Sequence, residues 1–301
     1  MEFDQAASGD EYYEGGSNGE GGDQVVTNFV QLKQTMSQVY MRVVAILLRK
    51  AMYPSQHDLQ GWDDGKVYRR EVCDTFINCH YILGESMLAP IVAEVVRLMS
   101  ESNTHSWQNL EVYAFGLRAV DEVVNVESAT SLKPLFTPEF ISGRVRAVIQ
   151  DTNASVALRN GLLCLIGSYS KWWNVHPETL PLALDCITDA LKQPGLAYSA
   201  ALAFQRVCEN CSDKLQGVVD GMTELCVQLL GFDETIFPAR QQQRVFESLG
   251  GVISTLTPQE QMASIDRLTR SVMAKLHTDI AAFGQVASAG PGLIDANTVQ
   301  A

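Results

Sequence analysis

The chain has 301 residues, of which 22 are Lys or Arg and 35 are Asp or Glu, so its formal net charge is −13. This acidic balance argues against a duplex-binding protein and against a polybasic membrane-surface protein, because both need a basic footprint. Hydrophobic residues make up 46% and charged residues 19%, which is typical of a folded chain rather than a disordered one. An acidic surface suits basic partners.

The sequence predicts neither a membrane span nor a secretory signal. The longest uncharged stretch, 280–294, is too short and too polar to cross a bilayer. The acidic start, MEFDQAASGD, lacks the basic and then apolar pattern of a signal peptide. Seven cysteines, an odd number, lie mostly within apolar helical patterns, which favours reduced, buried thiols in an intracellular protein.

Residues 1–24 differ from the rest of the chain. They contain seven acidic residues, six glycines and no Lys or Arg. We expect this segment to be disordered, because it has too little apolar surface to fold. It is interpreted as a solvated linker, with an acidic arm for a basic partner as the alternative.

After Gln24, helical periodicity continues almost throughout. Ile91, Val92, Val95 and Met99 share one helix face. Three further stripes predict buried helix faces: Val112, Phe115, Ala119, Val120, Val123 and Val124; Val245, Leu249, Val252, Ile253 and Leu256; and Met262, Ile265, Leu268, Val272, Met273 and Leu276. Thr257-Pro258-Gln259-Glu260 predicts a helix start, with Thr as the N-cap and Glu three residues later. No sustained alternation of period two competes, so the sequence predicts an all-α fold.

The helices are predicted to come in pairs. Corresponding positions in the first helices, Gly116, Gly161, Ala201 and Ser248, are 45, 40 and 47 residues apart. This spacing is typical of HEAT or armadillo repeats, whose stacked helix pairs share one continuous core. The prediction is an α-α solenoid, a helical-repeat superhelix over residues 25–283, followed by a flexible tail, 284–301. The first helices are expected near 107–125, 153–173, 196–212 and 239–256, the second helices near 138–150, 178–192, 214–230 and 258–282, and earlier helices near 25–52, 67–85 and 87–101.

Motifs that could carry chemistry are weak. Cys208 and Cys211 form a single CxxC, which as a zinc site would need two further ligands and as a redox site an exposed helix start. Two buried thiols on one helix are the favoured interpretation, and a zinc or redox enzyme is the alternative. The five histidines are scattered, and no phosphate loop or nucleophile elbow occurs. Gly250-Gly251 could permit a close helix approach or a kink. We expect a binding protein without cofactor or catalytic residues.

Two pairs of residues are candidates for contacts with a partner. Asp185 and Asp189 are four residues apart and therefore share one helix face. They are interpreted as a solvated acidic stripe or as a contact surface for basic cargo. Of the adjacent Trp172 and Trp173, one is expected to close the hydrophobic seam, and the other to be exposed as a possible binding hot spot.

Several segments, in the same order, resemble the importin-β (karyopherin) superfamily, in its branch of importin 13 and transportin 3. They are Tyr53-Pro54-Ser55, Trp62-Asp63-Asp64 leading into YRREVCDT at 68–75, Ser106-Trp107-Gln108 with Glu111, Trp172 with His176-Pro177 and Leu180-Pro181-Leu182, and Val207-Cys208-Glu209-Asn210-Cys211 with Lys214-Leu215. Each motif is short, and their shared order makes the resemblance specific. It covers only the middle of the family's longer chains.

The resemblance implies a nuclear transport receptor that carries protein cargo between nucleus and cytoplasm under control of the GTPase Ran. The implied partners are protein cargo, Ran and Phe-Gly nucleoporins, without nucleic acid or membrane. The second helices, such as 178–192, would line the inner surface, so Asp185 and Asp189 would face cargo or Ran. The N-terminal repeats that make the main contact with Ran in the family have no counterpart here, so the chain is interpreted as a fragment or short form. A non-transport HEAT scaffold for protein complexes is the alternative.

Overall fold

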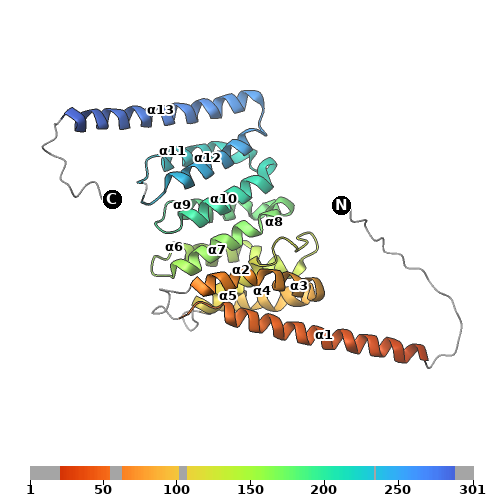
Figure 1. Ribbon diagram of the computed structural model, residues 1–301. Coiled ribbons are helices and arrows are strands. Elements are labelled where there is room, and N and C mark those ends of the chain that lie inside the picture. Colours follow the sequence, from red (N-terminus) through yellow and green to blue (C-terminus); the bar gives the residue numbers. More distant parts are fainter. Residues whose placement is uncertain (1–20, 55–62, 102–106, 234, 289–301) are drawn as a thin grey trace, which may run out of the picture.

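The structure is a computed structural model that describes residues 21–54, 63–101, 107–233 and 235–288. Within these ranges every regular element is a helix. The helices form an elongated stack, with α1 (Gly21–Ala51) at one end and α13 (Pro258–Ser288) at the other (Figure 1). The predicted all-α helical-repeat fold is therefore confirmed.

The first end of the stack consists of α1 and three shorter helices. Because α1 packs against α3 and α5, its C-terminal part lies in the stack, while its N-terminal half extends beyond it (Figure 1). A single core runs through the molecule and begins at Val44, Leu48 and Ala51 of α1. The three shorter helices are α2 (Asp63–Glu71), α3 (Cys73–Leu83) and α4 (Glu85–Ser100).

The rest of the stack consists of alternating first and second helices. The first helices pack in sequence, α5 on α7, α7 on α10 and α10 on α12. Each second helix lies against the following first helix, as α9 lies against α10 and α11 against α12. The first helices are α5 (Trp107–Arg118), α7 (Val156–Ser168), α10 (Ala197–Cys211) and α12 (Ala239–Ile253), and the second helices are α6 (Arg146–Gln150), α9 (Leu180–Leu191), α11 (Val219–Leu229) and α13.

Several predicted helices are shorter or divided. The helix expected over 107–125 ends at Arg118, and Val120 and Val124 reach the core from the turns that follow. The amides of Val120 and Asp121 donate to the carbonyl oxygens three residues earlier, of Leu117 and Arg118, so the chain leaves the α-helical pattern here. The helix expected over 153–173 divides at Tyr169 into α7 and α8 (Ser170–Val175). Short elements precede α6, α9 and α11: η2 (Thr130–Phe136), η3 (Glu139–Val145), η4 (Pro177–Thr179), η5 (Ser212–Lys214) and η6 (Gln216–Val218).

A glycine sets the spacing between two central first helices. A Cβ atom on Gly167 would lie 2.8 Å from Cα of Ala203, so α7 and α10 approach with almost no side chain between them. By contrast, a Cβ on Gly250 or Gly251 would meet nothing within 4 Å. Of the two options for Gly250-Gly251, a close helix approach or a kink, the close approach is therefore not formed there; a close approach occurs at Gly167 instead.

The apolar stripe predicted for the last helix is not buried. Met262, Ile265 and Leu276 are exposed, with 69%, 51% and 47% of their surface accessible. The helix contacts the stack through an adjoining face that includes the buried Ser264 and shares the partly buried Leu268 with the predicted stripe. The prediction of a buried stripe on this helix is corrected accordingly.

The predicted terminal segments lie largely outside the described residues. Of residues 1–24 the structure describes only the first turn of α1, from Gly21, and α13 continues to Ser288 beyond the expected start of the tail at 284. Ser55, Trp62 and Ser106 of the family-like motifs also lie outside. Among the described helices, none has the length and apolarity required to cross a membrane.

Candidate functional site

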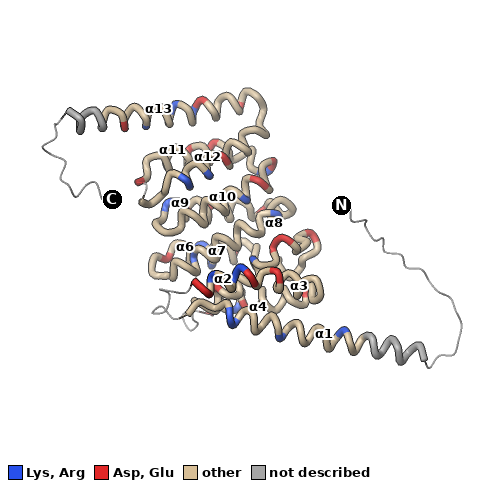
Figure 2. The backbone as a smooth tube through the Cα atoms, in the orientation of Figure 1, with Lys and Arg blue, Asp and Glu red and all other residues tan. Residues whose placement is uncertain are grey.

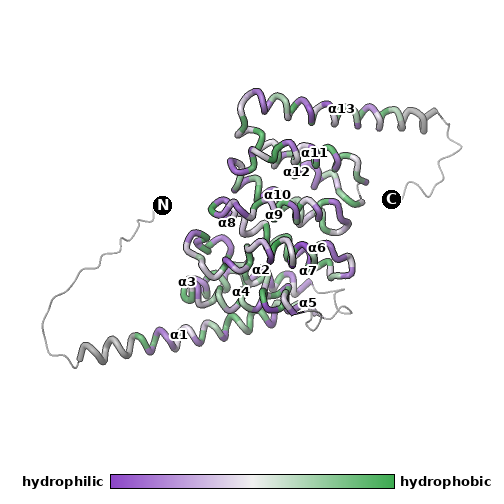
Figure 3. Tube along the Cα trace, turned by 180° about the vertical axis from the view of Figure 1, so that it is seen from behind, coloured by the Kyte–Doolittle hydropathy of each residue, from purple (hydrophilic) through white to green (hydrophobic). Residues whose placement is uncertain are grey.

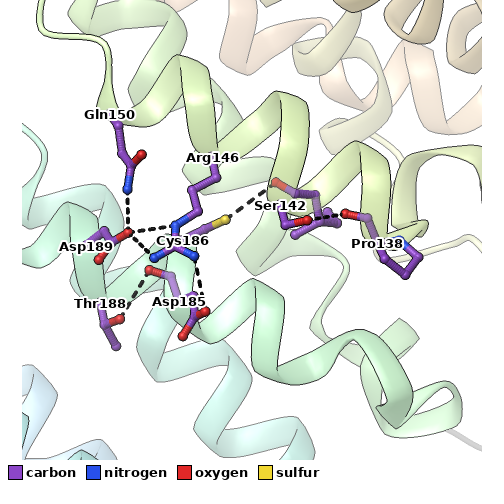
Figure 4. A network of polar contacts seen from close by, with 9 residues as sticks. Pro138, Ser142, Arg146, Gln150, Asp185, Cys186, Thr188 and Asp189 are labelled. Carbon is purple, nitrogen blue, oxygen red and sulfur yellow. Dashed lines mark hydrogen bonds and ion pairs between the residues drawn. The ribbon is translucent and has the colours of Figure 1, made fainter.

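The acidic pair predicted from the sequence lies on α9 and is held by an arginine from α6. Nη2 of Arg146 is 2.7 Å from Oδ2 of Asp189, and Nη1 is 3.3 Å from Oδ2 of Asp185 (Figure 4). The amide of Gln150 donates a further hydrogen bond to Asp189 at 2.8 Å. The hydrogen bond that Arg146 donates to Asp189 is the main cause that raises the pKa of Arg146 above its usual value. The negative charge of the two aspartates is therefore partly neutralised by an arginine from the neighbouring repeat.

The two carboxylates differ in their availability. The Asp189 side chain is 30% exposed and accepts hydrogen bonds from two side chains, whereas the Asp185 side chain is 54% exposed. The Asp185 contact with Arg146 is also the longer one. Asp189 therefore serves mainly to fasten α9 to α6, and Asp185 retains most of its capacity to bind a basic group.

The side chain between these two aspartates in the sequence belongs to the buried apolar core. Cys186 is fully buried between the two aspartates in sequence, and its thiol lies 3.8 Å from the carbonyl oxygen of Ile141 in the preceding repeat. Burial raises the pKa of Cys186 to about 12, so it stays a neutral thiol at physiological pH. The site therefore offers surface carboxylates on a rigid apolar base, which suits binding rather than acid–base chemistry.

A second acidic pair lies on the next second helix, α11, and was not singled out from the sequence. Asp220 and Glu224 on α11 are both exposed. They are four residues apart, the same spacing as Asp185 and Asp189 on α9. Asp220 pairs with Arg267 of α13 at 3.0 Å. The signal was present in the sequence, since DCITD at 185–189 and DGMTE at 220–224 share the spacing of acid, Thr and acid. We name Asp185, Asp189, Asp220 and Glu224 the acidic row.

The tryptophan pair lies in the core. Trp172 is 4% exposed and Trp173 is completely buried. Phe136 of η2 stacks on Trp172 with ring centroids 4.8 Å apart and meets Trp173 edge-on at 5.3 Å. The expectation that one indole is exposed for a partner is wrong, because η2 closes over both. They fix the loop between two repeats instead.

The CxxC cysteines are also buried. Cys208 and Cys211 are free thiols, and burial raises the pKa of Cys211 to about 12 and that of Cys208 further. Among the described residues, no three His, Cys, Asp or Glu side chains are placed to hold a metal ion. A reactive thiolate needs a lowered pKa and access, and neither is present here. These thiols fit the interpretation as helix-packing residues.

The family model of the Transportin-3/Importin-13 third TPR domain matches residues 139–225. This range runs from η3 into α11 and includes the whole acidic row and both tryptophans. It covers less than a third of the chain.

Curated proteins match over a longer range. Importin-13 of Rattus norvegicus and Importin-13 of Homo sapiens are each 22% identical over 250 residues, which is 81% of this chain and 25% of those proteins. Transportin MOS14 of Arabidopsis thaliana is 23% identical over 248 residues, or 79% of this chain and 25% of its own length. The chain therefore spans about a quarter of the length of the curated relatives it matches, and their names are those of transport receptors rather than of enzymes.

A solved structure has the same fold. The structure titled "Importin13 cytosolic state" superposes with a TM-score of 0.68 at 22% identity, over 87% of this chain and 29% of that one. The likeness of fold agrees with the sequence matches and with the helix pairs described above. The resemblance found in the short motifs is confirmed.

Proposed function

Because the chain is related to the importin-β family, in the branch of importin 13 and transportin 3, we propose that it acts as the central repeat block of a nuclear transport receptor. Its task would be to bind protein cargo rather than to catalyse a reaction. Cargo binding and release would be controlled by Ran, and the protein would move between nucleus and cytoplasm. Phe-Gly nucleoporins are a further proposed partner.

The acidic row is the observation that supports this proposal. It presents pairs of carboxylates on successive second helices, over the range that the family model matches. Surface carboxylates on a fixed scaffold attract basic segments and accelerate their association. The Arg146 and Arg267 contacts hold the spacing of the row while Asp185 and Glu224 stay exposed. We therefore propose that cargo presents a Lys- or Arg-rich surface to these two helices.

Titration of the purified chain with a fluorescent Lys- and Arg-rich peptide at physiological salt tests the row. The Asp185→Asn/Asp220→Asn variant should raise the Kd at least about fivefold, because each removed charge is worth on the order of 1 kcal/mol at such a surface. Neither change touches the core, since both side chains are largely exposed. Circular dichroism should show an unchanged helical spectrum.

A matched control distinguishes the effect of the acidic row from a general effect of the chain's negative charge. The Asp64→Asn/Glu71→Gln variant removes the same two charges from exposed positions on α2, at the first end of the stack. Its Kd should stay within about twofold of the original value, because charges farther than a Debye length of about 8 Å are largely screened. Equal weakening by both variants would contradict a specific role for the row.

Parallel titrations with Ran-GTP and with a Phe-Gly-repeat peptide distinguish the alternative function. A non-transport scaffold shares the fold but binds neither probe. Binding of either probe supports a transport role for this block of repeats, and binding of neither by the folded chain supports the scaffold.

A further inference from the structure

A cavity of about 370 Å³ lies between α2, α5 and α7. Its volume is within the range of roughly 300–1,000 Å³ that is typical of small-molecule sites. The walls from α5 and α7 are interior parts of the stack, because α5 also contacts α1 and α7 also contacts α10 (Figure 3). The charged and amide side chains that line the cavity are Lys66, Arg69, Arg70, Glu111, Arg118 and Asn160.

The lining has an excess of positive charge, although the chain as a whole carries −13. Four of its side chains are cations, and among the described residues that line it Glu111 is the only carboxylate. Arg69 engages that carboxylate fully, since Nη1 donates to Oε1 at 2.7 Å and Nη2 donates to Oε2. Lys66, Arg70 and Arg118 therefore contribute positive charge that no lining carboxylate balances.

Two of these three cations, Arg70 and Arg118, have no ion pair within the described part of the chain. Lys66 pairs with an aspartate of its own helix at 2.9 Å, but both side chains are largely exposed, so that water weakens this contact. Asp121, which follows α5, pairs with Arg206 of α10 at 3.2 Å rather than with Arg118. Lys66 and Arg70 are four residues apart and share one face of α2, whose Lys and Arg are blue in Figure 2.

Two side chains of the lining each have a buried polar atom without a hydrogen-bond partner among the described residues. These atoms are Nε of Arg118 and Oδ1 of Asn160. The Asn160 amide nitrogen donates to the carbonyl oxygen of Gly195 at 3.1 Å, which leaves its oxygen as the unsatisfied end. A buried polar atom without a partner destabilises the fold, so such atoms in a native protein call for a bound group. Because one atom is a charged donor and the other a neutral acceptor, a ligand that satisfies both carries an anionic oxygen and a hydroxyl group.

We propose that this cavity binds a small phosphorylated polyol. Arginine donates to phosphate oxygens through its fork of N–H groups, and such charge-assisted hydrogen bonds are stronger than neutral ones. Lys66, Arg70 and Arg118 supply three positive charges, which suit a ligand with several phosphate charges better than a single carboxylate. The Oδ1 atom of Asn160 accepts a hydrogen bond from a hydroxyl group of the polyol. The bound ligand connects α2 with α5 and α7.

Isothermal titration calorimetry with inositol trisphosphate, which carries both phosphates and hydroxyl groups, tests this proposal at physiological salt. The full chain should bind one equivalent with a Kd below about 100 µM. The Arg70→Gln/Arg118→Gln variant should raise the Kd at least about tenfold, because it removes two charged donors to phosphate. Circular dichroism should show an unchanged helical spectrum, since neither arginine has an ion pair to lose within the described part of the chain. Inositol and inorganic phosphate, each with only one of the two groups, should bind at least about tenfold more weakly than inositol trisphosphate.

A control variant, Lys192→Gln/Arg240→Gln, removes two positive charges from exposed positions that do not line the cavity. Its Kd for inositol trisphosphate should stay within about twofold of the original value, because distant charges are screened at physiological salt. An equal loss of affinity in both variants, or equal binding of inorganic phosphate, would overturn the proposal. The absence of measurable heat at about 1 mM inositol trisphosphate would also overturn it.

Two further probes distinguish other sources of anionic groups. They are a peptide rich in Asp and Glu, and vesicles that contain phosphatidylinositol bisphosphate. Both should bind more weakly than inositol trisphosphate. Stronger binding of either probe, with a loss of affinity in Arg70→Gln/Arg118→Gln, would assign the cavity to an acidic protein segment or to a lipid headgroup, and the proposal of a soluble ligand would be wrong.

Discussion

At the scale of single residues, the most consequential polar contact is a buried ion pair that joins three helices. Arg69 of α2 is 9% exposed and Glu111 of α5 is 2% exposed. Nη1 of Arg69 donates to Oε1 of Glu111 at 2.7 Å, Nη2 donates to the other oxygen, and Nε donates to the carbonyl oxygen of Ala51 at 2.8 Å. The guanidinium also lies 4.2 Å from the centre of the Tyr53 ring. The contact fastens α2 and the end of α1 to the first of the regular repeats.

We expect Glu111→Ala to lower the free energy of unfolding by about 3–5 kcal/mol, because it leaves a buried arginine without its counter-charge. Urea denaturation checks this value. As a control, Lys66→Ala removes a pair with Asp63 whose side chains are 68% and 83% exposed, and it should change stability by less than about 1 kcal/mol. Equal effects of the two substitutions would contradict the structural role of the Arg69–Glu111 pair.

The acidic row shows which features of the candidate site could be predicted from the spacing of residues in the sequence. The spacing of Asp185 and Asp189 sufficed to place them on one helix face, since residues four apart are neighbours on a helix. Their partner Arg146 lies about 40 residues earlier in the chain, and only the stacking of α6 on α9 brings it near. The burial of Trp172 and Trp173 likewise depends on η2, whose position no local pattern predicts. Contacts between repeats therefore decide which candidates remain accessible.

At the scale of helices, the approach of α7 and α10 depends on one glycine. Gly167→Ala should lower the free energy of unfolding by about 1–3 kcal/mol, because the new methyl group would meet the backbone of Ala203 at 2.8 Å. Gly250→Ala makes the same change in an exposed part of α12 where a methyl group meets nothing within 4 Å. It should stabilise the protein by about 0.4–1 kcal/mol. Thermal and urea unfolding should show a loss of stability for Gly167→Ala and a gain for Gly250→Ala.

A second comparison tests which helix faces are buried. Leu249 on α12 is completely buried, so Leu249→Ala should cost about 2–5 kcal/mol. Met262 on α13 belonged to an equally convincing stripe but is 69% exposed, so Met262→Ala should stay within about 0.5 kcal/mol. The measurement is urea unfolding of both variants. A large loss for Met262→Ala would place the α13 stripe in the core after all.

This contrast explains how far sequence could predict the elements. Periodicity identified the helices and the repeat spacing, because Gly116, Gly161, Ala201 and Ser248 all lie in first helices. It could not distinguish the buried stripe of α12 from the exposed stripe of α13, since both follow the same period. It also missed the short elements η2 and η3, where loop contacts rather than periodicity determine the conformation.

At the scale of the whole molecule, the stack is a one-dimensional array in which each repeat contacts only its neighbours. In such arrays stability is roughly the sum of repeat and interface terms, so that end repeats with one neighbour open most easily. The centre of this stack contains the completely buried Leu163, Trp173 and Phe204. Toward the first end, by contrast, almost every side chain between residues 30 and 39 of α1 is exposed. Local stability should therefore fall from the centre toward both ends.

Hydrogen exchange followed by mass spectrometry measures this gradient. Backbone amides of α7 and α10 should exchange slowest. Those of residues 30–39 of α1 and 276–281 of α13 should exchange within seconds, because these residues are almost all exposed and little packing opposes their opening. Exchange at one common rate in all helices would instead mean that the stack opens as a single cooperative unit, and the nearest-neighbour description would not apply to it.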